Sequence, residues 1–174
     1  LLVAVTMPLW ASYLVKIYAW RTILQSNGLL GWLLSPFGLE GPGLTEIVNT
    51  WLVLTYLWLP YMILPVYAGI ERIPNSLLEA SADLGGRGWM TFRRVIFPQL
   101  IPALAAGSIF TFSLSIGDYI VPDLVSDAKF IGNVIYDNSA LGSFPVAAAY
   151  SFVPIGVMIA YLYFARRLGA FESL

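Results

Sequence analysis

Residues 47–70 read IVNTWLVLTYLWLPYMILPVYAGI, a run without a single charged side chain. A helix of about 20 apolar residues spans the hydrocarbon core of a bilayer, so this run predicts a membrane-spanning helix. Pro60 and Pro65 lie inside it. Prolines are tolerated in such helices where neighbouring helices satisfy the freed backbone carbonyls. We therefore expect a bent helix packed against others.

Three more apolar runs accompany this one, at residues 1–23, 95–117 and 144–165. The composition agrees, because 59% of the residues are apolar and only 11% are charged, whereas a soluble domain carries about a quarter charged residues. The sequence therefore predicts an all-α membrane protein, a polytopic bundle with about four spans in residues 1–174.

The same composition excludes several classes of function. Histidine and cysteine are both absent, which removes the usual general base, the commonest metal ligand, thiolate sites and disulfides. We expect no metal site. The net charge of -1 offers no basic face for a nucleic acid.

The basic residues predict an orientation, since arginine and lysine mark the cytoplasmic side of a membrane. Six arginines lie between the second and third runs or after the fourth: Arg72, Arg87, Arg93, Arg94, Arg166 and Arg167. The opposite loops carry mainly acids, with one lysine: Glu40, Glu46, Asp123, Asp127, Asp137 and Lys129. The loop at 71–98 and the chain end are therefore predicted to be cytoplasmic, although Lys16 and Arg21 then lie at the outer end of the first run.

The sequence starts at Leu1, inside an apolar run without a basic leader. A signal peptide would carry a positively charged region before its apolar segment. We expect residues 1–174 to be the C-terminal portion of a single transmembrane domain whose earlier helices precede Leu1.

The loop at 71–98 carries the most specific pattern. Ser76 and Glu79 have the spacing of a capping box at a helix start, and Gly85 is suited to end that helix in a left-handed conformation. Leu77, Leu78 and Leu84 would give the helix an apolar face. Such a helix suits the groove of a partner protein, and an amphipathic linker resting on lipid headgroups is the alternative.

Glu79-Ala80-Ser81, Gly85 and Val95-Ile96-Phe97-Pro98 resemble the EAA loop of the membrane subunits of ATP-binding-cassette importers. The family pattern is Glu-Ala-Ala, then a glycine and a distal Ile-x-Leu-Pro. Ser81, Val95 and Phe97 are conservative departures from it. The resemblance implies that Ser76, Glu79, Ala80, Ser81 and Gly85 dock an ATPase subunit.

The resemblance extends over essentially the whole chain, and the chain is similar to the polyamine branch, the spermidine and putrescine permeases. The stretches that carry it include Pro8-Leu9-Trp10, Tyr13-Leu14-Val15, Tyr18-Ala19-Trp20, Asn27-Gly28, Gly117-Asp118-Tyr119 and Ile131-Gly132-Asn133. It implies a permease in the bacterial inner membrane, with two cytoplasmic ATPase subunits, a second permease subunit and an external solute-binding protein. Branches that import ferric iron, thiamine, opines or phosphonates share much of this pattern and remain alternatives. The resemblance implies no enzyme activity in this chain.

Asp118 and Tyr119, at the end of the third run, are candidates for the translocation path, because an acid at membrane depth is costly unless it faces water or a partner. The alternative is an interfacial acid that lies in the headgroup region or caps the end of the third run.

Two other classes fit the residues less well. An intramembrane aspartyl protease would need a glycine two positions before Gly117-Asp118, where Ser115 stands, and the order of its acids is reversed here. A secondary transporter needs charges inside its spans, and the second and fourth runs have none. The sequence also contains no Gly-x-x-x-x-Gly-Lys loop. We therefore expect no cofactor in this chain, with ATP and magnesium bound by the partner ATPase.

Overall fold

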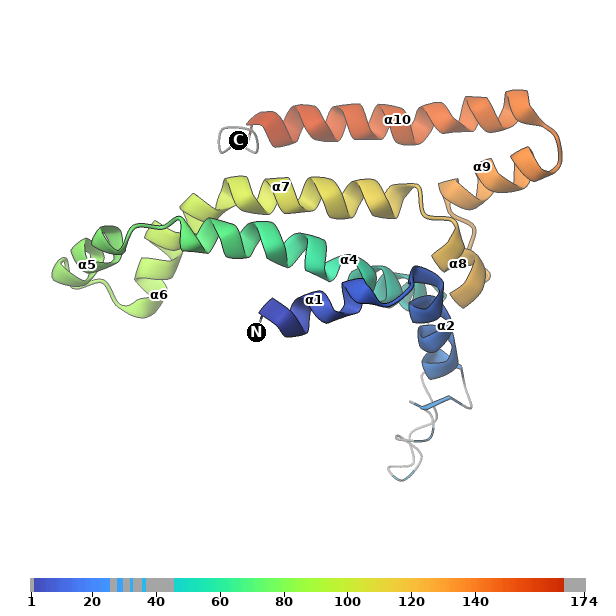
Figure 1. Cartoon of the computed structure of the whole chain (residues 1–174). Coiled ribbons are helices and arrows are strands. Elements are labelled where there is room, and N and C mark those ends of the chain that lie inside the picture. The colour runs from blue at the N-terminus through green and yellow to red at the C-terminus, as the bar shows by residue number, and fades with distance from the viewer. Residues whose placement is uncertain (1, 26–27, 30–31, 33–35, 37–45, 168–174) are drawn as a thin grey trace. The chain divides into compact units, whose positions relative to one another are not determined.

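The computed structural model describes residues 2–25, 28–29, 32, 36 and 46–167, and these residues form helices without a strand (Figure 1). The shorter elements are α1 (Leu2–Trp10), α2 (Tyr13–Leu24), α5 (Asn75–Asp83), α8 (Ile120–Val125) and α9 (Ile131–Ala140). The predicted all-α class is confirmed.

Three helices are long and apolar enough to cross a membrane. They are α4 (Glu46–Glu71), α10 (Phe144–Arg167) and a continuous helix over Gly88–Ile116. The last consists of α6 (Gly88–Thr91), a π-helical turn (Phe92–Ile96) and α7 (Phe97–Ile116). Three of the four predicted runs thus form helices long enough to span the membrane.

The prediction of one helix over residues 1–23 is wrong. The chain leaves the helical conformation between α1 and α2, where Ser12 has φ -56° and ψ 139°. Serine favours this position before a helix because its side chain competes with the backbone for hydrogen bonds. With 12 residues, α2 is about 18 Å long, which is too short to cross a core of about 30 Å.

The chain divides into two compact units, residues 1–60 with 114–156 and residues 61–113 with 157–174. Helices α4, α7 and α10 contribute to both. The prediction that residues 1–174 form one domain stays a prediction.

The first unit has a core shared by α2, α4 and α8, centred on Ile17, Val53, Leu57 and Val121. In the second unit, Ala105 of α7 packs with Ala165 of α10. Gly107 lies so close to α4 that an added Cβ would be 2.9 Å from the Met62 Sδ atom and 3.2 Å from the Met62 carbonyl oxygen, so a side chain there would displace Met62.

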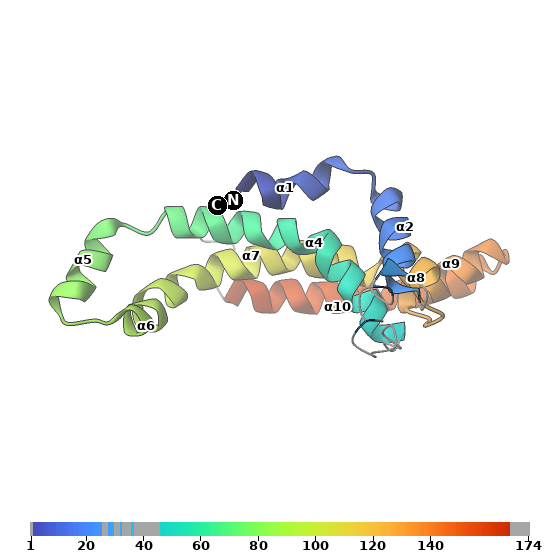
Figure 2. The same ribbon diagram turned by 90° about the horizontal axis from the view of Figure 1, so that it is seen from below.

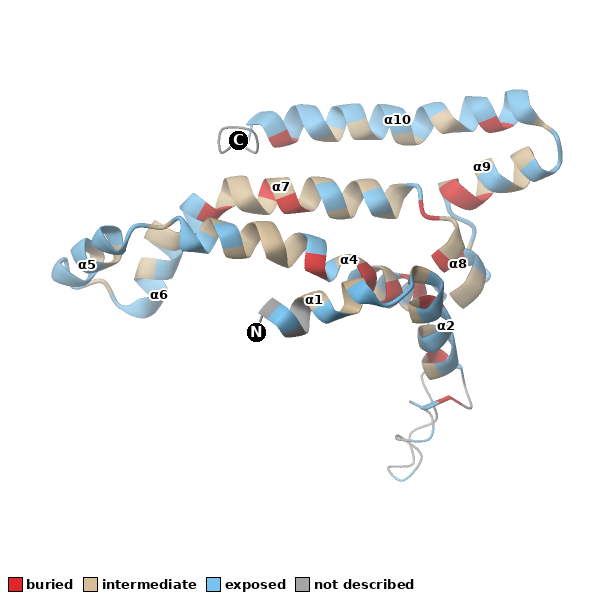
Figure 3. Ribbon diagram, viewed as in Figure 1, coloured by how far each residue is buried: buried red, intermediate tan, exposed pale blue. Residues whose placement is uncertain are grey.

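Many apolar side chains remain exposed, most of all on α10 (Figure 3). Phe152, Ile159 and Phe164 are examples, each more than 60% exposed. Exposed apolar surface of this extent is expected where lipid or another membrane helix replaces water.

Candidate docking loop and carboxylate site

Helix α5 lies within the loop predicted to be cytoplasmic, and it starts two residues earlier than expected. Pro74 is extended, with φ -66° and ψ 136°, and the helix begins at Asn75. Ser76 is therefore inside the helix, and no side chain caps its start. The predicted capping box of Ser76 and Glu79 is wrong, because a capping residue must lie outside the helix for its oxygen to reach the free amides.

The end of α5 agrees with the prediction. Gly85 has a φ of +74°, its amide donates to the Ala82 carbonyl, and the Gly86 amide donates to the Ser81 carbonyl. These two bonds form a Schellman motif. A side chain at residue 85 would strain this left-handed backbone, so Gly85 fixes where the helix ends.

Ser81, one of the departures from the EAA pattern, makes a contact that the sequence analysis missed. Its hydroxyl lies 2.8 Å from the Thr91 hydroxyl of α6. Gly86 passes close to the same pair, because a Cβ there would lie 2.5 Å from the Ser81 Oγ atom. This hydrogen bond joins α5 to α6. It could not be predicted from the presence of a serine at residue 81.

A concavity of about 340 Å³ opens between α5 and the helix that follows. Its walls are mainly apolar, and the lining residues are Leu77, Ala80, Ser81, Leu84, Gly86, Met90, Arg94 and Val95. Leu84 is 89% exposed. Glu79 is also exposed, so this loop has both an exposed carboxylate and an apolar groove at its surface.

The other predicted site, around Asp118, belongs to the first unit. Asp118 is buried, and its carboxylate accepts three hydrogen bonds: from the Tyr13 hydroxyl at 2.6 Å, the Ile120 amide at 3.0 Å and the Val121 amide at 3.1 Å. The two amides open α8, so Asp118 caps this helix. Capping was expected at the end of the third run, whereas Asp118 caps the start of α8. Its role in the path stays a prediction.

Two aromatic pairs include Tyr13, which bonds Asp118, and Tyr119, which follows Asp118 in the chain. Tyr13 stacks on Trp58 of α4, with ring centroids 6.0 Å apart. Tyr119 stacks on Tyr136 of α9 at 4.3 Å. Because Asp118 binds Tyr13, the carboxylate connects α2 and α4 to the start of α8.

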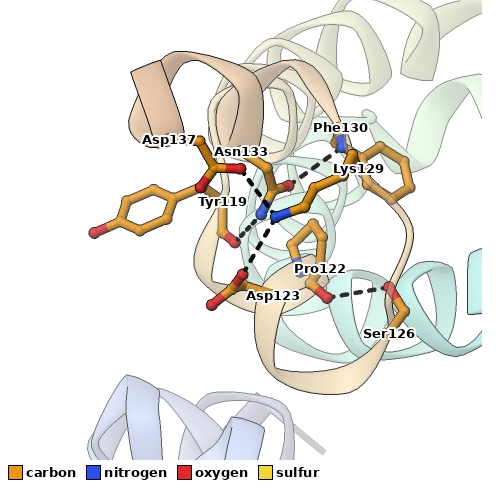
Figure 4. Close-up of polar contacts among 8 residues, drawn as sticks. All are labelled: Tyr119, Pro122, Asp123, Ser126, Lys129, Phe130, Asn133 and Asp137. Atoms are coloured by element: carbon orange, nitrogen blue, oxygen red, sulfur yellow. Dashed lines mark hydrogen bonds and ion pairs between the residues drawn. The ribbon is translucent and has the colours of Figure 1, made fainter. Parts of the chain in front are cut away.

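Asn133 joins α9 to the same region (Figure 4). It is fully buried, its amide donates to the Tyr119 carbonyl at 2.9 Å, and its oxygen accepts from the Phe130 amide at 3.3 Å. Asn133 belongs to a stretch that carries the family resemblance, Ile131-Gly132-Asn133, but no role was predicted for it. An asparagine near a helix start is a further signal that could have pointed to it.

The acids of the second predicted outer loop gather around Lys129 (Figure 4). Its ammonium lies 3.0 Å from an oxygen of Asp137 and 3.9 Å from one of Asp123. The hydrogen bond to Asp137 raises the pKa of Lys129. Among the described residues, no group of three acids could hold a metal ion, and Glu40 lies outside them.

The chain matches the family described as the inner membrane component of binding-protein-dependent transport systems, over residues 2–170. It belongs to this family. The resemblance seen in the EAA-type loop is thereby confirmed at the level of the family.

Similar proteins in this transport family are named as permeases. The chain is 51% identical to the inner membrane ABC transporter permease protein YdcU of Escherichia coli, over 99% of this chain and 60% of the relative. It is 36% identical to the spermidine/putrescine transport system permease protein PotB of Haemophilus influenzae, over 94% of this chain and 59% of the relative. The chain spans about 60% of the length of these relatives.

Proposed function

We propose that this chain is part of the membrane-spanning permease of an ATP-driven importer for a polyamine such as spermidine or putrescine. The observation that carries the proposal is the end of α5, where Leu84, the groove and Glu79 are presented on a helix fixed by Gly85. Relatives named as polyamine permeases match nearly the whole chain, which supports the choice of solute.

The proposed mechanism transmits movement from an ATPase subunit to the membrane helices. The ATPase binds ATP and magnesium and contacts α5 at Glu79, Ala80 and Leu84. Helix α5 is hydrogen-bonded to α6 through the hydroxyls of Ser81 and Thr91. Because α6 is the first part of the continuous helix over Gly88–Ile116, a displacement of α5 moves that helix. A rigid helix carries such a displacement into the membrane, where the path alternates between its two sides.

The complete importer would contain two cytoplasmic ATPase subunits, a second permease subunit and an external solute-binding protein in the bacterial inner membrane. Asp118 and Tyr119 are the path residues of this proposal. The carboxylate of Asp118, which binds the Tyr13 hydroxyl, and the stacked ring of Tyr119 support it, since carboxylates and ring faces both attract ammonium groups.

Leu84 provides the test of the docking step. In the full-length subunit, Leu84→Ser should weaken binding of the ATPase subunit about thirtyfold, because a leucine that becomes buried contributes about 2 kcal/mol. Polyamine uptake into vesicles should fall with it. Binding is measured with the purified ATPase and the permease in nanodiscs.

Leu141→Ser is a matched control. Leu141 is 81% exposed and also precedes a glycine with positive φ, Gly142 at +75°, but it ends α9 in a predicted outer loop. This control should bind the ATPase normally. Equal affinities for Leu84→Ser and the wild type would contradict docking at α5, and uptake of iron, thiamine, an opine or a phosphonate in place of polyamines would contradict the choice of solute.

A further inference from the structure

The segment from Gly88 to Phe97 carries two different faces. Met90, Arg94 and Val95 line the groove beside α5. Trp89, Phe92, Arg93 and Phe97 do not line it and are exposed, Trp89 by 73%. The second set, called here the aromatic–arginine face, is not used by the docking proposal.

The three rings of the aromatic–arginine face form a row. Trp89 and Phe92 stack with centroids 5.6 Å apart, and Phe92 and Phe97 lie 6.2 Å apart. In an α-helix, residues five apart point about 140° away from each other. The π turn, closed by the Phe97 amide on the Phe92 carbonyl, brings this pair to the same side.

Pro98 directly follows the π turn and favours a wider turn at this point. A proline has no amide to bond the carbonyl of residue 94, and its ring collides with that carbonyl in a regular α-helix. A wider turn relieves the collision. The backbone therefore brings Phe92 and Phe97 to the same side of the helix.

The length of the helix places this face at the membrane surface. Residues Gly88–Ile116 are 29 in number, about 43 Å of helix, against a hydrocarbon core of about 30 Å. The 20 residues of α7 fill that core. The preceding turns then lie at the depth of the lipid headgroups, where tryptophan and arginine are favoured.

Arg93 supplies the positive charge of this face. It is exposed and forms no ion pair with a carboxylate of the described residues. A guanidinium beside exposed rings at headgroup depth matches a lipid phosphate, and an anionic headgroup more than a zwitterionic one.

We infer that the aromatic–arginine face binds anionic phospholipid, with Arg93 on the headgroup and Trp89, Phe92 and Phe97 against the upper acyl chains. The assignment to the cytoplasmic leaflet rests on the proposed function. Contact with lipid itself does not, since it depends only on the length and surface of this helix.

The experiment counts the lipids retained by the full-length permease. The protein is placed in nanodiscs of equal phosphatidylglycerol and phosphatidylcholine, and the lipids that stay bound on release are counted by native mass spectrometry. Arg93→Gln should lower the ratio of retained phosphatidylglycerol to phosphatidylcholine about fivefold, the effect of one basic residue at a membrane surface. Arg94→Gln, its neighbour on the groove side, should leave the ratio unchanged.

An unchanged ratio in Arg93→Gln, or an equal drop in Arg94→Gln, would overturn the inference. Binding of the ATPase subunit is measured separately on the same variants. If Arg93→Gln weakens that binding and leaves the lipid ratio intact, the face contacts protein and the inference is wrong. Because the lipid count requires no ATPase, failure of docking at Leu84 would leave it interpretable.

Discussion

Asp118 is buried, and its carboxylate accepts three hydrogen bonds. These bonds offset the cost of removing the carboxylate from water. Each bond to a charged acceptor contributes about 1.5–3 kcal/mol relative to its loss. Two of the donors are backbone amides at the start of α8, and the third is Tyr13. The carboxylate therefore stabilises the fold whether or not a solute passes it.

Two substitutions separate these roles. Tyr13→Phe removes one hydrogen bond and keeps the charge, whereas Asp118→Asn removes the charge and can keep the bonds from the amides. Both should lower the melting temperature of the detergent-solubilised subunit. If Asp118 lies on the path, only Asp118→Asn should lower uptake of spermidine by vesicles more than tenfold. Equal, small losses of uptake in both variants would leave Asp118 a structural cap.

At the scale of elements, the membrane helices could be predicted from the sequence, because a long uncharged segment has few stable structures other than a helix that spans the membrane. The break at Ser12 was not predicted, because hydropathy indicates which segments lie in lipid and does not indicate where a helix is interrupted. Gly85 was predicted because few residues other than glycine adopt positive φ. The start of α5 was not predicted correctly. The helix begins at Asn75, directly after the extended Pro74, so Ser76 lies inside it and does not cap it.

In the candidate site, too, some features could be predicted from the sequence and others could not. Motif spacing located α5, but the contact between Ser81 and Thr91 and the bond from Tyr13 to Asp118 join residues that are 10 and 105 positions apart. Pairing over such separations depends on packing, which local sequence patterns do not report. Asn133 was missed for this reason.

The bond between α5 and α6 leads to a prediction about Ser81. Ser81→Ala restores the alanine of the EAA pattern but removes the hydrogen bond to Thr91, which is worth about 1 kcal/mol. Amide hydrogen exchange in α5 should then speed up about fivefold in the full-length subunit. Thr91→Val should have the same effect, and the double variant should add little to either. Additive effects of the two substitutions would show that the hydroxyls do not hold the helices together.

At the scale of the whole molecule, the sequence and the helix boundaries make one consistent prediction of topology. The acid Glu46 begins α4, while Arg72 follows its end, and α10 ends in Arg166 and Arg167. If each long helix crosses once, then α5 lies on the arginine-rich, cytoplasmic side and the turn after α9 lies outside. The proposed docking of an ATPase requires this arrangement.

Leu84 and Leu141 provide matched reporters of the two sides, because the sequence has no cysteine and both leucines are highly exposed before a glycine of positive φ. Single variants Leu84→Cys and Leu141→Cys, each in a full-length subunit otherwise free of cysteine, are treated in spheroplasts with a membrane-impermeant maleimide. Cysteine at residue 141 should react in intact spheroplasts, and cysteine at residue 84 only after lysis. Their similar backbones and exposures mean that a difference in labelling reports the side of the membrane and not local accessibility. Labelling of residue 84 from outside would invert the topology, move the aromatic–arginine face to the outer leaflet and separate α5 from any cytoplasmic ATPase.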